Sequence, residues 1–219
     1  MEIRLLFGLS GGKDSLALLY TLHRLKQFLP VKFEIMAITI KPGFDGFDTT
    51  ELERICRELE IDYVIENSDI KEIVFDLRQE KNPCSLCANL RRGMLNSFAK
   101  EHGCNKIALG HHQDDVIETF FLSLFYEGNI HTFAPVTYLS RAELHVLRPM
   151  IYVPEKDIKH FIKTNNLPVI NKCCPMDGYS KREYMKDLLK TLAKDIPPIR
   201  ASVFGAITRS NIKGWTKSN

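Results

Sequence analysis

Short runs of apolar residues alternate with longer segments in which apolar residues recur every three or four positions. Four runs are long enough to form buried strands. They lie at residues 3–7, 32–40, 61–65 and 106–109. The segments between them carry helical faces, such as Leu86, Leu90, Met94 and Phe98 before the fourth run. This alternation predicts an α/β fold, a Rossmann-like parallel sheet with helices on both faces.

The C-terminal part of the chain predicts two short segments that pair as a hairpin or end as one more strand, followed by three helices. These elements lie at residues 136–139, 144–147, 154–165, 181–192 and 204–212. Pro154 suits the first turn of its helix, because a backbone N–H would have no partner there. We therefore expect an α/β domain over residues 1–150. A helical, basic extension over residues 151–219 is expected to pack on it.

Composition narrows the class of protein. The chain has 219 residues and a formal net charge of +3, and no stretch approaches the roughly 20 apolar residues of a membrane-spanning helix. The sequence enters its first strand without a secretory signal, so we expect a cytoplasmic protein with no membrane partner. Its six cysteines are then expected to be thiols or metal ligands rather than disulfides.

The small net charge conceals an asymmetry along the chain. Residues 156–219 carry 13 Lys and Arg against 5 Asp and Glu, whereas the remaining residues carry 17 against 22. A basic extension of this kind favours an anionic macromolecular partner such as RNA. A solvated basic helix explains the charge alone nearly as well.

A glycine turn follows the first strand and opens the first helix. The turn reads Ser10-Gly11-Gly12-Lys13-Asp14-Ser15. Paired glycines let the backbone approach an anion, and the start of a helix offers unpaired N–H groups. The turn is not a Walker A loop, because only three residues separate Gly8 from Gly12 and Asp14 follows Lys13. It predicts a phosphate site; the alternative is a turn that only caps a helix.

A second glycine turn follows the fourth strand. It reads Gly110-His111-His112-Gln113-Asp114-Asp115. Asp114 and Asp115 fall in the first turn of a helix, where two carboxylates can hold Mg²⁺ beside a triphosphate. His111 can contact a phosphate or a base, whereas ordinary acidic capping of the helix is the alternative for the carboxylates. If the first and fourth strands are neighbours, both turns face one ligand at the carboxyl edge of the sheet.

The cysteines supply a second kind of chemistry. Cys84 and Cys87 have the spacing that lets two thiolates reach one metal, and Cys173-Cys174 follow much later. Three thiolates fit a [4Fe–4S] cluster with one open iron. Zinc bound by four cysteines and a catalytic disulfide are the alternatives. Cys56 and Cys104 lie among apolar residues and are expected in the core.

The turn at residues 10–15 resembles the pyrophosphatase loop of N-type ATP pyrophosphatases, the PP-loop enzymes. This resemblance implies cleavage of ATP between the α- and β-phosphates, with AMP passed to the substrate. Other segments resemble the tRNA 2-thiocytidine synthase family. They are Pro83-Cys84-Ser85-Leu86-Cys87, Leu90-Arg91-Arg92-Gly93, residues 106–115, Arg148-Pro149, Glu155-Lys156-Asp157-Ile158 and Leu167-Pro168. The resemblance runs over nearly the whole chain.

This resemblance implies the adenine nucleotide α-hydrolase type of Rossmann-like fold, with ATP, Mg²⁺ and a [4Fe–4S] cluster as cofactors. The third cluster ligand is expected in the later cysteine loop, where Cys174 fits the family's register better than Cys173. The expected nucleotide contacts are Ser10, Gly11, Gly12, Lys13, Asp14, Ser15, Thr39, Gly110, His111 and Asp115. The expected catalytic residues are Cys84, Cys87, Cys174, Asp14, Arg91 and Asp114, with Asp114 and Asp115 as magnesium ligands.

These features predict an ATP-dependent tRNA thiolase that adenylates a pyrimidine carbonyl oxygen and replaces it with sulfur, with 2-thiocytidine as the favoured product. The expected partners are tRNA, a sulfur donor such as a cysteine desulfurase, and a second copy of the chain. Lys181, Arg182, Lys186 and Lys190 are expected to follow the RNA backbone. The alternatives are a 2-thiouridine synthase, an amine ligase, a cluster-dependent desulfurase and a zinc-stabilised nucleotide-binding module.

Overall fold

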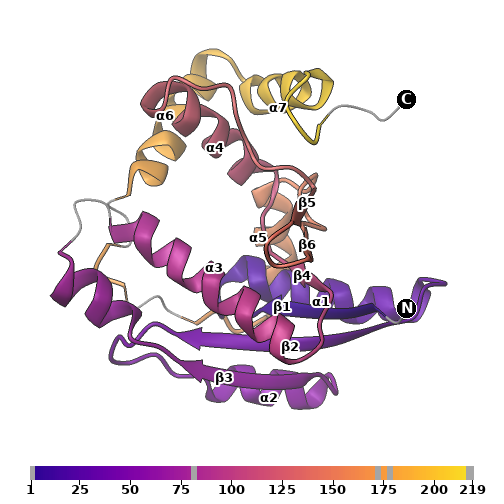
Figure 1. Cartoon of the computed structure of the whole chain (residues 1–219). Helices are drawn as coiled ribbons and strands as arrows, with labels where there is room; N and C mark the ends of the chain where they lie inside the picture. Colours follow the sequence, from indigo (N-terminus) through magenta and orange to yellow (C-terminus); the bar gives the residue numbers. More distant parts are fainter. Residues whose placement is uncertain (1–2, 80–82, 171–173, 177–179, 216–219) are drawn as a thin grey trace.

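A six-stranded sheet forms the body of the protein (Figure 1), and its strands lie in the order β3-β2-β1-β4-β6-β5. The computed structural model describes residues 3–79, 83–170, 174–176 and 180–215. The strands are β1 (Ile3–Gly8), β2 (Phe33–Lys41), β3 (Asp62–Asn67), β4 (Lys106–Ala108), β5 (Val136–Leu139) and β6 (Leu144–Leu147). All neighbouring pairs are parallel except β5 and β6, which form the predicted hairpin.

The centre of the sheet is β1, which pairs with β2 on one side and β4 on the other. Leu6 lies opposite Met36 on β2 and Ile107 on β4. Successive side chains of a strand point to opposite faces, so Leu6 joins one core cluster while Phe7 joins the other. Strands buried on both faces need helices on both faces.

Helices cover both faces, as predicted. One face carries α1 (Lys13–Phe28), α2 (Thr50–Glu58) and α5 (Glu155–Thr164), whose buried Leu16, Ile55 and Ile158 share a cluster with Phe7. The other face carries the π-helix η1 (Glu72–Leu77) and α3 (Pro83–Glu101), through Val74 and Phe98. The predicted doubly covered α/β fold is therefore confirmed.

Three helices form a separate group beyond the sheet, in the upper part of Figure 1. They are α4 (Gln113–Tyr126), α6 (Lys181–Asp195) and α7 (Ile199–Arg209). Their shared core includes Ile117, Leu189, Phe204 and Trp215, and the Trp215 indole donates a hydrogen bond to the Phe133 carbonyl at 3.2 Å. The C-terminal helices thus pack on α4, while α5 packs on the sheet. A domain boundary at residue 150 stays a prediction.

The largest difference from the expected elements is the start of α7. The sequence pattern predicts a helix from residue 204, whereas α7 begins at Ile199 with Pro198 as its N-cap. Ile199 joins Phe204 and Ile207 in the core shared with α4, so packing against that helix extends the apolar face by one turn. No helix in the described part of the chain is long and apolar enough to cross a membrane.

Candidate active site

The turn after β1 leaves the start of α1 open to an anion. Gly11 is buried with φ +76°, and a Cβ there would lie 2.9 Å from Ile170 Cβ, so a side chain does not fit. Ile170 also donates its backbone N–H to the Gly11 carbonyl at 3.0 Å. Gly12 is the N-cap of α1, and no side chain of the described residues caps the helix there. The first amide groups of α1 are therefore available to phosphate oxygens.

Three hydroxyl groups predicted to contact a nucleotide brace this turn. Ser15 Oγ donates to the Gly12 carbonyl at 2.9 Å, and Ser10 Oγ lies 3.2 Å from Ser15 Oγ. Thr39 is buried; its hydroxyl donates to the Leu9 carbonyl at 2.5 Å and accepts from Tyr63 at 2.7 Å. Thr39 thus supports the residue before the turn, and its expected nucleotide contact stays a prediction.

Lys13 lies between two carboxylates. Its Nζ is 2.8 Å from Asp14 Oδ2 and 3.1 Å from Glu155 Oε1. Burial acts to lower the pKa of Lys13, but hydrogen bonds and charge from Asp14 and Glu155 outweigh burial and raise it. The ammonium group therefore keeps its positive charge, which suits it to bind a phosphate.

The second glycine turn meets the first, because β4 lies beside β1. A Cβ on Gly110 would lie 3.0 Å from the Asp14 carbonyl oxygen, so only glycine allows this approach. His112 Nε2 lies 3.6 Å from Asp14 Oδ1. His112 also caps α4: its Nδ1 accepts from the Asp115 N–H at 3.4 Å, and its own N–H donates to Asp115 Oδ2 at 2.9 Å. The expectation that the two turns adjoin is confirmed.

Asp114 is buried and uses both carboxylate oxygens within the chain. Oδ2 accepts from the Glu155 backbone N–H at 2.7 Å, and Oδ1 accepts from Arg200 Nη1 at 2.5 Å. Asp114 thereby ties the start of α5 and helix α7 to α4. In this arrangement it anchors the fold, and its expected magnesium role stays a prediction. Asp115 is less buried, and its Oδ1 lies 3.5 Å from Arg182.

His111 is a neutral imidazole. Burial lowers its pKa to about 4, and the nearby charges of Arg148 and Arg182 act in the same direction, against Asp115. The His111 ring packs on the Phe133 ring, with centroids 4.7 Å apart. The Arg148 guanidinium lies over the Phe133 ring, 4.9 Å from its centroid. His111 Nδ1 is buried without a hydrogen-bond partner among the residues that the structure describes. These contacts fix the ring but leave one nitrogen free to bond.

The cysteines converge beside the start of α3. Cys84 is exposed in the first turn, and Cys87 and Cys174 are half-buried. Burial raises the pKa of Cys84, and the charges of Cys174 and Cys87 raise it further, so these three thiols lie near one another. Arg91 Nη2 lies 3.9 Å from Cys87 Sγ, on the side that helical spacing predicts. Cys173 lies outside the described residues.

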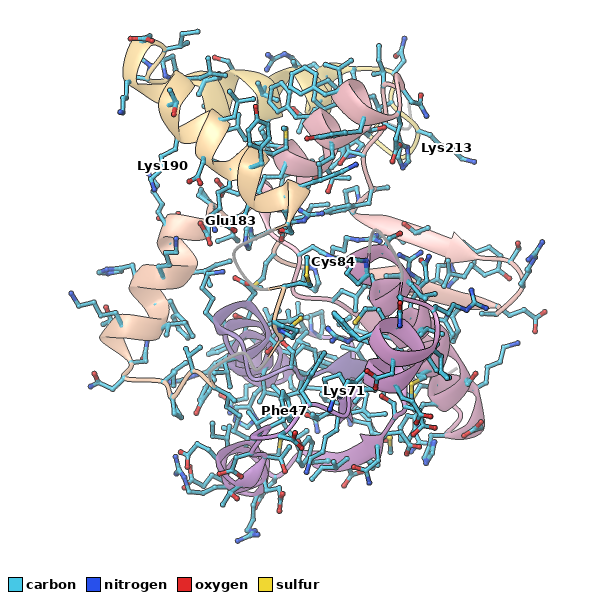
Figure 2. The ribbon with its side chains drawn as sticks, turned by 90° about the vertical axis from the view of Figure 1, so that its left-hand side faces the viewer. Phe47, Lys71, Cys84, Glu183, Lys190 and Lys213 are labelled. Carbon is cyan, nitrogen blue, oxygen red and sulfur yellow. The ribbon has the colours of Figure 1, made fainter. Side chains whose placement is uncertain are left out.

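Cys84 lies between the α4–α6–α7 group and the sheet, as Figure 2 shows. The thiols are gathered but not closed around an ion: in the ranges that the structure describes, no three His, Cys, Asp or Glu side chains are arranged as metal ligands. Cys56 and Cys104 are buried in the core, as predicted. Burial raises the pKa of Cys56 to about 12, so that thiol is protonated and unsuited to bind metal.

Two cations expected to follow the RNA backbone form ion pairs within the protein while staying partly exposed. Arg182 Nη1 lies 3.4 Å from Glu118 Oε2, and Lys186 Nζ lies 3.2 Å from Glu155 Oε1. Burial raises the pKa of Glu118 to about 7, partly opposed by Arg182. Sequence reasoning gave no role to Glu118, Glu155 or Arg200. For Glu118, the sequence does offer a signal: it follows Asp114 by four residues, which places both acids on one side of α4.

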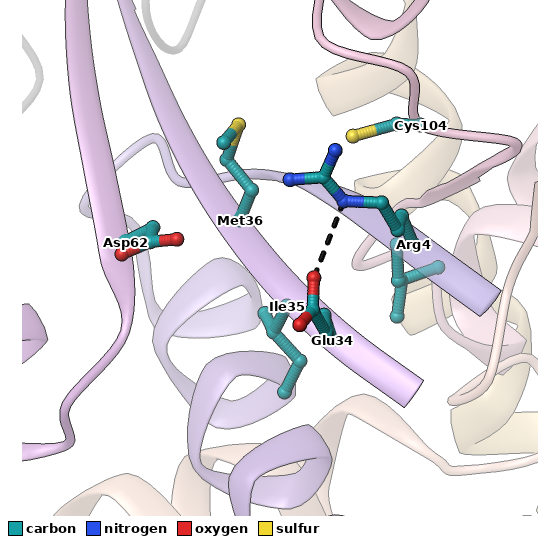
Figure 3. Close-up of a pocket in the computed structure, with 7 residues that line it drawn as sticks. Arg4, Glu34, Ile35, Met36, Asp62 and Cys104 are labelled. Carbon is teal, nitrogen blue, oxygen red and sulfur yellow. Dashed lines mark ion pairs between the residues drawn. The ribbon is translucent and has the colours of Figure 1, made fainter. Parts of the chain in front are cut away.

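At the opposite edge of the sheet, the described residues line a much smaller space. A cavity of about 10 Å³ lies at the amino ends of the strands and has room for no more than a water molecule (Figure 3). An ion pair between Arg4 Nε and Glu34 Oε2, 3.2 Å long, crosses it. The candidate site is therefore at the carboxyl edge, where parallel sheets bind their ligands.

The profile of the PP-loop domain matches residues 1–187. This chain belongs to the PP-loop family. Among its relatives, a tRNA-cytidine(32) 2-sulfurtransferase from Citrifermentans bemidjiense is 39% identical over 208 residues, which cover 94% of this chain and 82% of the relative. A protein of the same name from Syntrophotalea carbinolica is 41% identical over 207 residues, covering 93% and 80%. The predicted resemblance to this branch of the PP-loop family is thus confirmed.

A solved structure of the family has the same fold. The U34-tRNA thiolase NcsA from Methanococcus maripaludis, solved with its [4Fe-4S] cluster, superposes with a TM-score of 0.73 and 27% identity. The match covers 93% of this chain and 70% of that one. The similarity to the PP-loop family therefore includes both the glycine turn and the cysteine-bearing helix α3.

Proposed function

We propose that this protein is an ATP-dependent tRNA sulfurtransferase that forms 2-thiocytidine. The observation that carries this proposal is that the PP-loop is bonded at Gly11 to Ile170, four residues before Cys174, whose thiol acts on Cys84 together with Cys87. Its relatives at 39% and 41% identity are named tRNA-cytidine(32) 2-sulfurtransferases. A PP-loop activates an oxygen for displacement, and a thiol-bound cluster suits the sulfur that replaces it.

The PP-loop part of the site activates the target base. A carbonyl oxygen of the target pyrimidine attacks the α-phosphate of ATP, and the bond to the β-phosphate breaks with release of pyrophosphate. The amides at the start of α1 and the Lys13 ammonium stabilise the charge that builds on the phosphates. Holding base and phosphate together supplies much of the remaining rate enhancement.

Magnesium suits Asp14 and Asp115 better than Asp114. The side chains of Asp14 and Asp115 are 32% and 20% exposed, and both lie where the two glycine turns meet. Mg²⁺ is held by one or two carboxylates together with substrate phosphates, so two partly exposed carboxylates are a sufficient set. The Asp114 side chain is only 11% exposed and is bonded to the Glu155 amide and to Arg200, so it is less accessible to a metal ion.

The thiols of Cys84, Cys87 and Cys174 fit a [4Fe–4S] cluster, because there are three of them, they act on one another's charge, and none is fully buried. When bound, such a cluster supplies an iron without a protein ligand, where the incoming sulfur can bind. Arg91, beside Cys87, is placed to orient the activated base or the departing AMP. The target base must leave its stack to enter the site, which costs less for a loop nucleotide.

Nucleoside analysis tests the proposal. Protein purified without oxygen is incubated with unmodified tRNA, ATP, Mg²⁺ and sulfide, and the digested tRNA is examined by mass spectrometry. We expect 2-thiocytidine together with one AMP and one pyrophosphate for each sulfur incorporated. 2-Thiouridine in its place would assign the chain to the activity named for the structural neighbour. ATP binding without any thiolated nucleoside would contradict the proposal.

A further inference from the structure

Glu155 occupies the first position of α5, and the function proposed above leaves it without a role. Its side chain is only 11% exposed, yet three lysine ammonium groups reach it. Burial of a carboxylate is costly unless charged partners bond to it. The three lysines offset the cost of burying Glu155, and their position beside the PP-loop suggests that this carboxylate has a function there.

The two oxygens of Glu155 have different partners. Oε1 lies 3.1 Å from Lys13 Nζ and 3.2 Å from Lys186 Nζ, whereas Oε2 lies 2.9 Å from Lys159 Nζ. Burial acts to raise the pKa of Glu155, but bonds and charge from Lys159, Lys13 and Lys186 outweigh burial and lower it to about 2. The carboxylate is thus ionised at any pH at which the protein works.

Glu155 is also fixed at its backbone, because its N–H donates to Asp114 Oδ2 at 2.7 Å. The other partner of Lys13 is different. Asp14 is the next residue of the same turn, and its side chain is 32% exposed. A triphosphate that approaches Lys13 can displace Asp14, which has solvent to move into, whereas Glu155 is held on every side.

We infer that Glu155 is the positioning residue of Lys13: it holds the ammonium group at the phosphate site when Asp14 yields to the nucleotide. Through Lys186 the same oxygen joins α6 to the PP-loop, and α6 begins shortly after the segment that contains Cys174. Glu155 thereby links α6, which follows Cys174 in the chain, to Lys13 of the PP-loop. The inference rests on the proposed ATP site.

Equilibrium binding of α,β-methylene-ATP with Mg²⁺ tests this role without requiring sulfur transfer. Glu155→Gln should weaken binding about tenfold, because a charge-assisted bond to Lys13 is lost. Glu155→Asp keeps the charge and should recover part of the loss. Lys186→Met should weaken binding by roughly threefold, since one of the ion pairs fixing Oε1 is removed. Lys159→Met is the matched control: it contacts Oε2 alone, and binding should stay within about twofold.

A double-mutant cycle separates positioning from a general effect on the fold. In a Lys13→Met background, Glu155→Gln should cost almost nothing further, because its effect passes through Lys13. An equal loss in both backgrounds, or unchanged or tighter binding by folded Glu155→Gln protein, would overturn the inference. A wild-type chain that binds the analogue but never thiolates tRNA would contradict the proposed function while leaving this inference standing. A wild-type chain that does not bind the analogue would overturn both.

Discussion

The PP-loop and the cysteine helix adjoin, but the protein holds them in different ways. Around the PP-loop, charges are matched within the chain: Lys13 with Asp14 and Glu155, and Asp114 with Arg200, at 2.5 to 3.1 Å. Around the cysteines, the described part of the chain offers a looser contact, the approach of Arg91 to Cys87 at 3.9 Å. One region is organised by the polypeptide before any ligand binds, and the other gathers its ligands loosely.

This difference reflects what each region must bind. A phosphate chain arrives with its shape fixed, so rigid amides and a fixed ammonium group bind it with little reorganisation. A cluster imposes its own geometry on thiolates, and ligands that bind a metal are commonly ordered by it. We therefore expect substitutions in the closed region to act on ATP and on stability, and substitutions in the open region to act on metal content.

The largest effect is expected for Cys84→Ala. Removal of one cluster ligand should lower tRNA thiolation at least about 100-fold and iron content in parallel, since even outer partners of metal ligands are worth 10- to 100-fold. Binding of α,β-methylene-ATP should be unchanged, because the closed region does not depend on the cysteines. Cys104→Ala is the control; that thiol is in the core and thiolation should persist. Loss of nucleotide binding in Cys84→Ala would break the comparison.

Lys13→Ala should have the reverse profile. Loss of one charged donor to the transferring phosphates should reduce pyrophosphate release about 100-fold. Iron and sulfide content should match the wild type, because Lys13 contacts Asp14 and Glu155 rather than the thiols. Lys26→Ala removes an exposed lysine of the same helix, α1, and is the matched control, with release measured in the same assay. Iron lost together with pyrophosphate release would show that the two regions are not separable.

Asp114→Asn should act on stability. The change weakens the bonds to Arg200 and to the Glu155 amide. Because the Arg200 side chain is partly exposed, we expect the free energy of unfolding to fall by about 2 kcal/mol. For a chain of this size, that corresponds to a fall in Tm of roughly 4–8 °C. Asp157→Asn, an exposed position on the same helix as Glu155, should stay within about 0.5 kcal/mol. Equal melting of Asp114→Asn and wild type would contradict the anchoring role.

Much of the closed region can be predicted from the sequence, but the role of Asp114 cannot. Both glycine turns and the neighbouring strands follow from local patterns, since strand, turn and helix are consecutive. The partners of Asp114 are 41 and 86 residues away. Without the packed fold, an acid in the first turn of a helix has the same appearance whether it binds metal or anchors a distant helix.

The direction of the basic residues on α6 was also beyond the sequence. Lysines and arginines occur on more than one side of this helix. Which of them are buried depends on the side chains of α4 that pack against α6. Because α4 presents Asp115 and Glu118, Arg182 turns inward. The convergence of Cys84, Cys87 and Cys174 could be expected from the family resemblance, whereas spacing alone leaves the choice of third cysteine open.

The smallest effect concerns pH. The pKa of Glu118 is raised from 4.5 to about 7, so the folded chain holds more protons than the unfolded chain between those values. The free energy of unfolding should therefore fall as pH rises through that window. We expect a fall of only about 1 kcal/mol, because Arg182 stabilises the carboxylate as it ionises. Thermal melts of Glu118→Gln should show this decline reduced. An unchanged slope in the variant would assign the pH dependence to another group.

The central claim is that the open cysteine region holds an iron–sulfur cluster for a PP-loop thiolase. Its most direct test is the iron, zinc and acid-labile sulfide content of protein purified without oxygen. We expect roughly four irons and four sulfides per chain, lost in Cys84→Ala and retained in Lys13→Ala. One zinc per chain with neither iron nor sulfide would contradict the claim.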